Sequence, residues 1–195
     1  YIYTVDDDNM QTAFKGEFDK QYNLVINSEG KEYIATTKIP ALTVVPDSIW
    51  FKPAPQNPDT TTRVMMGKVT DPAGLGNYGR YFTKKNNEPF LPGESSVFDD
   101  AVVDGKTYTV QVKPGIDRNN PPEADSNFFK KGDVVTVKFC NINKATYTFW
   151  STWEFAYESI GNPFSQPNKV IGNISNGALG AFSGYAAWYK TIVAE

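Results

Sequence analysis

The first residues of this sequence that could bind a metal ion are acidic and lie near its start. Asp6, Asp8 and Glu17 match the first, third and last ligand positions of an EF-hand calcium loop. Met10 and Gln11 stand where that loop needs a further ligand and a turn glycine. We therefore interpret the stretch as a solvated acidic turn rather than a calcium site.

A second loop gathers oxygen ligands in the middle of the chain. Asp117, Asn119, Glu123 and Asp125 could surround a hard cation. Two consecutive prolines at 121–122 interrupt them, and this favours an ordinary surface loop. The sequence therefore predicts no metal site in either place.

Residue types that carry much of enzyme chemistry are scarce. The 195 residues include no histidine, which removes the usual general base at neutral pH, the Ser-His-Asp and Cys-His arrangements and the commonest metal ligand. Cys140 follows a strand pattern, and without a histidine to activate it we interpret it as a buried, inert thiol. No motif singles out a catalytic pair among the 22 acidic residues. We expect no catalytic residues and no cofactor, and the protein is predicted not to be an enzyme.

Aromatic side chains are the best candidates for ligand contact. Trp150 and Trp153 follow a helical period, which favours a place in the core. Strand alternation puts Trp188 on the face opposite Tyr185 and Tyr189, so a one-sided strand cannot bury all three. We keep Tyr185, Trp188 and Tyr189 as candidates for contact with an oligosaccharide or a peptide.

Short period-two patterns predict that these residues sit on a mainly-β scaffold. Gly30 occupies a left-handed turn position between the first two patterns, which predicts a hairpin. The predicted strands cover 22–27, 32–39, 47–51, 63–69, 77–84, 106–112 and 133–139. Many short strands of this kind indicate an antiparallel sandwich or barrel. We expect one mainly-β unit over 1–195, or two small packed subdomains over 1–52 and 53–195.

One segment departs from the strand pattern. Apolar residues recur at three- and four-residue steps over about 144–160, which predicts an α-helix lying against a sheet. Asn143 is placed to cap its N-terminus, and Gly161 to end it.

The uncharged stretch 170–189 carries Gly180 and Gly184 in a G-x-x-x-G spacing. Polar residues such as Asn173 and Asn176 make a membrane helix unfavourable there. We expect a turn-rich connection followed by a closing strand over 178–195. The net charge of −3 gives no sign of nucleic-acid binding or of a polybasic membrane surface.

Ordered motifs give this chain a family resemblance that runs from about residue 14 to the end. They read FDKQYNLVINSEGKEYIATTKIP (18–40), DPAGLGNYGRYF (71–82), VVDGKTYTV (102–110), KKGDVVTVKFCNINKATYTFW (130–150) and NPFSQPNKVIGNISNGALGAFSGY (162–185). The set resembles the Bacteroidetes exported lipoprotein family known as domain of unknown function 4249. Gly79 stands where a second tyrosine is common, and the tail reads NGALG rather than GGLG.

The resemblance implies an immunoglobulin-like β-sandwich in an exported, outer-membrane lipoprotein, on the periplasmic or cell-surface side. Its partner would be a TonB-dependent receptor, and its role would be accessory to nutrient uptake. Membrane attachment would come only through a lipidated N-terminus that precedes this sequence. The alternatives are a stand-alone carbohydrate- or peptide-binding module and a structural or adhesion domain.

Overall fold

The computed structural model describes residues 15–120, 128–160, 164 and 168–195. Its elements in chain order are β1 (Gln21–Ser28), β2 (Lys31–Lys38), β3 (Pro46–Pro53), β4 (Thr62–Thr70), β5 (Tyr78–Lys85), β6 (Leu91–Asp99), β7 (Thr107–Val112), β8 (Phe129–Lys130), β9 (Val134–Ile142), α1 (Lys144–Glu158) and β10 (Ala186–Val193).

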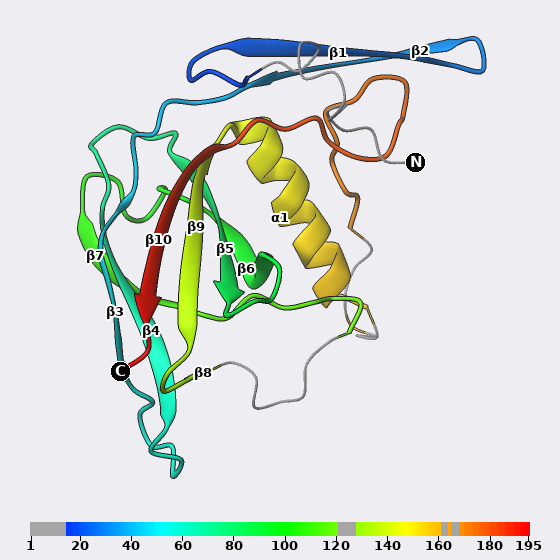
Figure 1. Ribbon diagram of the computed structural model, residues 1–195. Helices are drawn as coiled ribbons and strands as arrows, with labels where there is room; N and C mark the ends of the chain where they lie inside the picture. The colour runs from blue at the N-terminus through cyan, green and yellow to red at the C-terminus, as the bar shows by residue number, and fades with distance from the viewer. Residues whose placement is uncertain (1–14, 121–127, 161–163, 165–167) are drawn as a thin grey trace.

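Two antiparallel sheets form the body of the molecule. One has the strand order β10-β9-β5-β6, and the other has the order β3-β4-β7, with β8 also paired to β4. Neither described ladder closes on itself, so the expected mainly-β fold is confirmed as open sheets packed as a sandwich and not as a barrel (Figure 1).

The core lies between these two sheets. Alternation along β9 sends Val135, Val137 and Phe139 inward, where each is at most 6% exposed. Met65 of β4 and Phe129 of β8 meet the two valines from the opposite sheet and are fully buried. Burial of each such side chain stabilises the fold by about 1.5–3 kcal/mol.

Strands β1 and β2 form a separate two-stranded sheet that lies at the top of Figure 1. Glu29 and Gly30 make the turn with φ of 51° and 74°, which confirms the predicted hairpin. The later segment around Ile174 pairs with Ala35 of β2, and Ser175 N donates to Ile34 O at 2.9 Å. The tail thus reaches the outer edge of the hairpin. The division of the chain at residue 52 stays a prediction.

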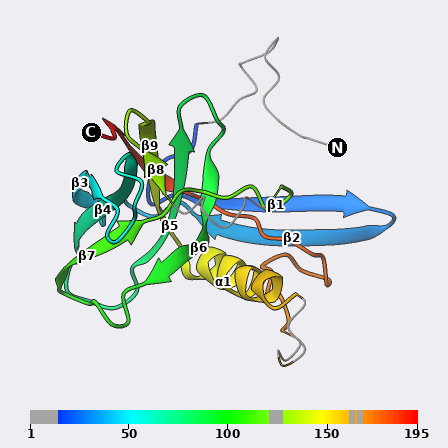
Figure 2. The same cartoon turned by 90° about the horizontal axis from the view of Figure 1, so that it is seen from below.

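Helix α1 covers the outer face of the sheet that contains β5 and β6 (Figure 2). Asn143 accepts a hydrogen bond from Thr146 N at 2.9 Å, so the predicted N-cap is confirmed. The helix ends at Glu158, two residues before the expected end, with Ser159 as C-cap. The expected stop at Gly161 lies outside the described residues.

Two strands were not expected, and one is shorter than predicted. β6 contains Pro92, Gly93 and the polar run 94–96, so it lacks apolar alternation. β8 has only two residues. The closing strand begins at Ala186 rather than at 178, because Asn173 bonds the backbone of Phe182 and holds the preceding segment in another conformation. Among the described residues, no helix has the length and apolarity needed to cross a membrane.

Candidate functional site

The three predicted ligand-contact aromatics fall in three different environments. Tyr185 accepts hydrogen bonds at its hydroxyl from Arg80 Nη1 (3.1 Å) and Trp150 Nε1 (2.8 Å). Trp188 is half-buried and packs against the core cluster between the sheets. Tyr189 is 53% exposed. The structure therefore separates these residues and does not bring them into one site.

Tyr189 has an aromatic neighbour on the outer sheet face. The ring of Phe90 packs edge-on at 5.9 Å between centroids, and Lys138 Nζ lies 5.9 Å from the Tyr189 centroid. Phe90 is itself 38% exposed. Two exposed rings beside a cation form a small platform on which a flat apolar group could stack.

Beneath α1 lies a buried polar cluster that joins the helix to the sheet. Glu154 of α1 accepts from Ser96 N at 2.9 Å and from the Ser96 hydroxyl. Arg118 lies 3.5 Å from the same carboxylate, and its side chain is 10% exposed. Arg80 donates to Ser96 Oγ at 3.0 Å and stacks 3.5 Å from the Trp150 ring centroid. Arg118 Nε has no hydrogen-bond partner among the described residues. The hydrogen bonds described above join members of the cluster to one another, which indicates a structural role.

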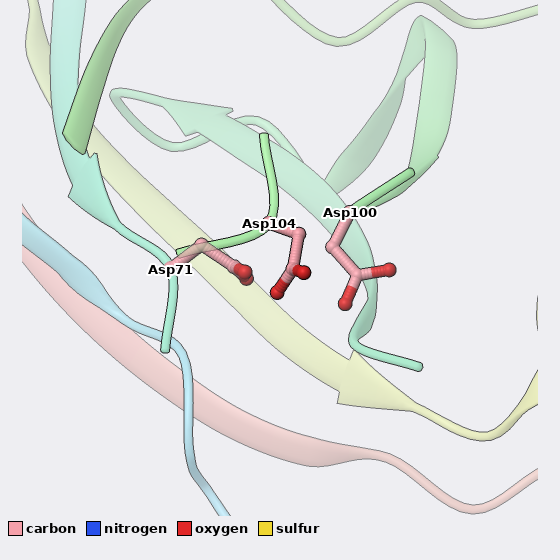
Figure 3. Close-up of side chains that lie close together, drawn as sticks. All are labelled: Asp71, Asp100 and Asp104. Carbon is pink, nitrogen blue, oxygen red and sulfur yellow. The ribbon is translucent and has the colours of Figure 1, made fainter. Parts of the chain in front are cut away.

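Three carboxylates that the sequence did not single out meet where β4 ends and β6 ends. Asp71, Asp100 and Asp104 bring one carboxylate oxygen each within 4.8 Å of one another (Figure 3). Asp71 and Asp100 are each 4% exposed. Carboxylate oxygens are ligands that a hard cation such as Ca²⁺ prefers.

Each of these carboxylates also accepts backbone N–H groups. Asp100 receives Gly76 N and Asn77 N, both at 2.8 Å, and Asp104 receives Gly74 N at 2.6 Å. Gly74 and Gly76 have φ of 121° and 122°, a conformation that favours glycine. The cluster therefore ties the loop 72–77 to the loop 100–106.

Burial governs the protonation of Asp71. Desolvation raises the pKa of Asp71, the N–H of Gly105 opposes that rise, and the neighbouring Asp100 and Asp104 charges add to it. Asp71 also lies near Tyr108, whose pKa is raised by burial and by the Asp71 charge. A carboxyl of this kind holds its proton to a higher pH than an exposed aspartate.

The acidic stretches weighed from the sequence do not assemble such a cluster among the described residues. Asp117 accepts from Asn119 N (2.9 Å) and Asn120 Nδ2 (3.1 Å), and these bonds lower its pKa. Glu123, Asp125 and the early acidic turn at 6–8 lie outside the described residues. The available signal for the Asp71 cluster was the glycine spacing in DPAGLG and VVDGK, which is typical of loops held by aspartates.

An apolar cavity of about 360 Å³ opens between the two sheets. Its walls come from both sheets and include Ile49, Val69, Val97, Val110, Val112 and Val137. This volume falls within the range of small-ligand pockets, about 300–1,000 Å³. Its rim includes the polar residues Ser95, Gln111 and Lys113.

The mouth of this cavity is framed by one continuous piece of chain. β6 borders it on one sheet and β7 on the other, and the loop 100–106 connects them at one end. At the other end Ile116 N donates to Pro92 O at 2.9 Å, which joins the segment after β7 to the start of β6. The aspartate cluster thus anchors one end of the frame.

Comparison with known proteins gives one match. The sequence model of a family described as Domain of unknown function (DUF4249) matches residues 1–191. No curated protein and no solved structure is significantly similar to the chain.

Proposed function

The chain belongs to the DUF4249 family, and we propose that it is a non-enzymatic accessory lipoprotein of the outer membrane that works with a TonB-dependent receptor in nutrient uptake. The motifs quoted above support export and lipid attachment by their resemblance to that family. The observation that carries a docking role is the hairpin β1–β2.

This hairpin presents apolar side chains to solvent. Val25 and Ile34 lie directly opposite each other in the β1–β2 ladder and are 55% and 46% exposed. Ile26, on the other face, is 43% exposed. Apolar residues grouped on an exposed sheet face mark surfaces that associate with other proteins.

The chemistry of the reactive groups supports a binding role over catalysis. Burial raises the pKa of Cys140 to about 11, so at neutral pH its sulfur is a thiol and not a nucleophilic thiolate. The carboxylates of Asp100 and Glu154 are occupied by backbone N–H groups. Groups held in this way position loops and elements and are poorly placed to transfer protons.

Affinity capture from solubilised native membranes tests the proposal. The tagged protein should recover a TonB-dependent receptor. A variant with Val25→Asp and Ile34→Asp should recover less, because charged side chains oppose burial of the hairpin face. Val193→Asp is the matched control, since Val193 is 53% exposed and is the last residue of β10. Figure 1 shows that this end of β10 lies away from the hairpin.

The possible outcomes distinguish the accessory role of the protein from docking through the β1–β2 hairpin. Recovery of the protein without any receptor contradicts the accessory role. Equal receptor recovery with all three proteins contradicts docking through the hairpin and leaves the accessory role standing.

A second candidate function, carbohydrate or peptide binding at the Tyr189 platform, is favoured by the exposed pair of Tyr189 and Phe90. Binding to a glycan and peptide array should fall when Tyr189→Ala removes the stacking ring. Trp188→Ala does not test this surface, because Trp188 packs between the sheets. Binding unchanged by Tyr189→Ala, or no binding at all, contradicts this candidate.

A further inference from the structure

The cavity between the sheets reaches the edges of two strands. In a strand only alternate side chains point to one face. The three consecutive residues 110–112 at the end of β7 line the cavity, as do the consecutive residues 97–99 of β6. The main chain of both strands therefore borders the hollow, in addition to their inward side chains.

Among the described residues, β6 and β7 are each paired on one side only. β6 pairs with β5 and β7 pairs with β4. The unpaired edge of β7 therefore presents backbone donors and acceptors beside the cavity. On β6, the carbonyls of residues 92–94 and the N–H of Ser96 already bond to Ile116, Arg118 and Glu154.

The two free edges differ in how well they are protected. β6 carries Pro92 and Glu94, and its ladder with β5 shifts register between Arg80 and Phe82. Proline, charge and irregular pairing are the features that keep an edge from accepting another strand. β7 reads TYTVQV, with no proline, glycine or charge. Its edge is the one suited to accept an added strand.

The inward side chains of β7 leave room beside that edge. Val110 pairs with Gly67 of β4. A side chain at position 67 would point into the core, toward Val112 and Ile49. Val110 points the same way as Gly67, yet it remains 43% exposed. An inward valine stays exposed here because the cavity beneath it is open.

The charges at the rim exclude one class of occupant. Among the described residues that line the cavity, Lys113 is the only cation, and its Nζ already lies 3.4 Å from Glu94. The Asp99 carboxylate faces α1 instead, where it accepts a hydrogen bond from the Tyr147 hydroxyl at 2.9 Å. A fatty acid would find no unpaired cation for its carboxylate among the described lining residues, whereas a neutral peptide backbone needs none.

We infer that the β7 edge (Thr107–Val112) binds an extended polypeptide segment of a partner protein, which adds as a strand and places alternate apolar side chains in the cavity. Main-chain hydrogen bonds to an open edge supply affinity in this mode, and the pocket selects the side chains. This inference rests on the proposed accessory role, because it names how a partner segment is held.

The test uses purified components, so the inference of strand addition can fail while capture of a receptor from membranes succeeds. The probe is a short fluorescein-labelled peptide in which threonine and valine alternate, and binding is followed by fluorescence anisotropy. We expect saturable binding to the intact protein. Gly67→Leu should weaken it at least about tenfold, because the new side chain would fill the cavity. Its Cβ would lie 3.4 Å from Val112 Cγ2, a tight contact that a small shift can relieve.

Two further variants keep the test decisive. Thr109→Leu changes an exposed residue of β7 that does not line the cavity, so peptide affinity should stay within about twofold of the unmodified protein. If circular dichroism shows that Gly67→Leu is unfolded, Ile49→Phe fills the same cavity from β3, because Ile49 pairs with Gly67 and shares its inward face.

Amide hydrogen exchange reports whether a strand has been added. Bound peptide should slow exchange of the β7 amides that face away from β4. No peptide binding, equal loss with Gly67→Leu and Thr109→Leu, or unchanged exchange along β7 would each overturn the inference. Binding of sodium dodecanoate without binding of the peptide would also overturn it, and would assign the cavity to a lipid chain.

Discussion

Glu154→Ala should be the most destabilising single truncation on α1. Glu154 is 4% exposed and accepts the backbone N–H of Ser96 at 2.9 Å. Hydrogen bonds to charged groups contribute about 1.5–3 kcal/mol each. The variant also leaves Arg118, 3.5 Å away, as a buried charge without its anion, and breaking such a pair costs about 3–5 kcal/mol.

These two contributions share one carboxylate and do not add in full. Arg118 keeps its bonds to the carbonyl oxygens of Gly93 (3.0 Å) and Glu94 (2.7 Å), which limits the loss. We therefore expect the free energy of unfolding to fall by about 4 kcal/mol for Glu154→Ala. Glu154→Gln keeps an acceptor for Ser96 but removes the charge, so its loss should be about 2 kcal/mol.

Urea denaturation followed by tryptophan fluorescence measures these losses. With a slope of about 2 kcal/mol per molar urea, the midpoint should fall by about 2 M for Glu154→Ala and about 1 M for Glu154→Gln. Glu158→Ala is the control, because Glu158 is exposed on the same helix and its removal should change stability by less than about 0.5 kcal/mol. A Glu154→Ala midpoint equal to that of the control would refute the assigned role of the cluster.

Three further predictions address single buried groups. Because burial raises the pKa of Asp71, the folded state holds a proton that the unfolded chain releases, and the free energy of unfolding falls as pH rises above the unfolded pKa. Urea melts should therefore show that the stability advantage of Asp71→Asn grows between about pH 3.5 and pH 7. A constant difference between the two proteins would contradict this. Cys140 should resist iodoacetamide in the native protein at pH 8 and react once unfolded, as mass spectrometry would show; fast native labelling would contradict its burial. Asn141→Leu should lower the free energy of unfolding by about 3 kcal/mol, because Val44 N and Val44 O both lose their partner, and a loss below about 1 kcal/mol would contradict it.

Local patterns were enough to predict the elements whose residues carry their own signal. Leu24 and Ile26 alternate in β1, Gly30 takes the left-handed turn position, and Asn143 caps α1. β6 carries no such signal, because Pro92 and Gly93 disfavour a strand and the residues that follow are polar. Its conformation is imposed by its pairing with β5 and by the bonds from Ser96 to Glu154. Tertiary contacts override propensity there.

The candidate sites depended on contacts that sequence spacing does not encode. Asp71 and Asp100 are far apart in the chain and meet only because β4 and β6 end at the same side of the sandwich. Strand alternation, which the sequence shows, accounts for the exposure of Tyr189 and the half-burial of Trp188. It does not account for the hydrogen bond that Arg80 donates to the Tyr185 hydroxyl. The cavity depends on the spacing of two sheets, which no local pattern determines.

Gly67→Leu should weaken peptide binding without lowering stability, and this distinguishes a binding site from a packing defect. Apolar atoms added to an open apolar cavity gain about 0.8 kcal/mol for each buried methylene. Replacement of a strand glycine also reduces the entropy of the unfolded chain. The melting temperature of Gly67→Leu should therefore stay the same or rise, while peptide affinity falls. A variant that loses both would show that the cavity walls cannot accept the side chain. If the space beside β7 is kept open for a partner strand, Gly67→Leu should give a stable protein with weakened peptide binding.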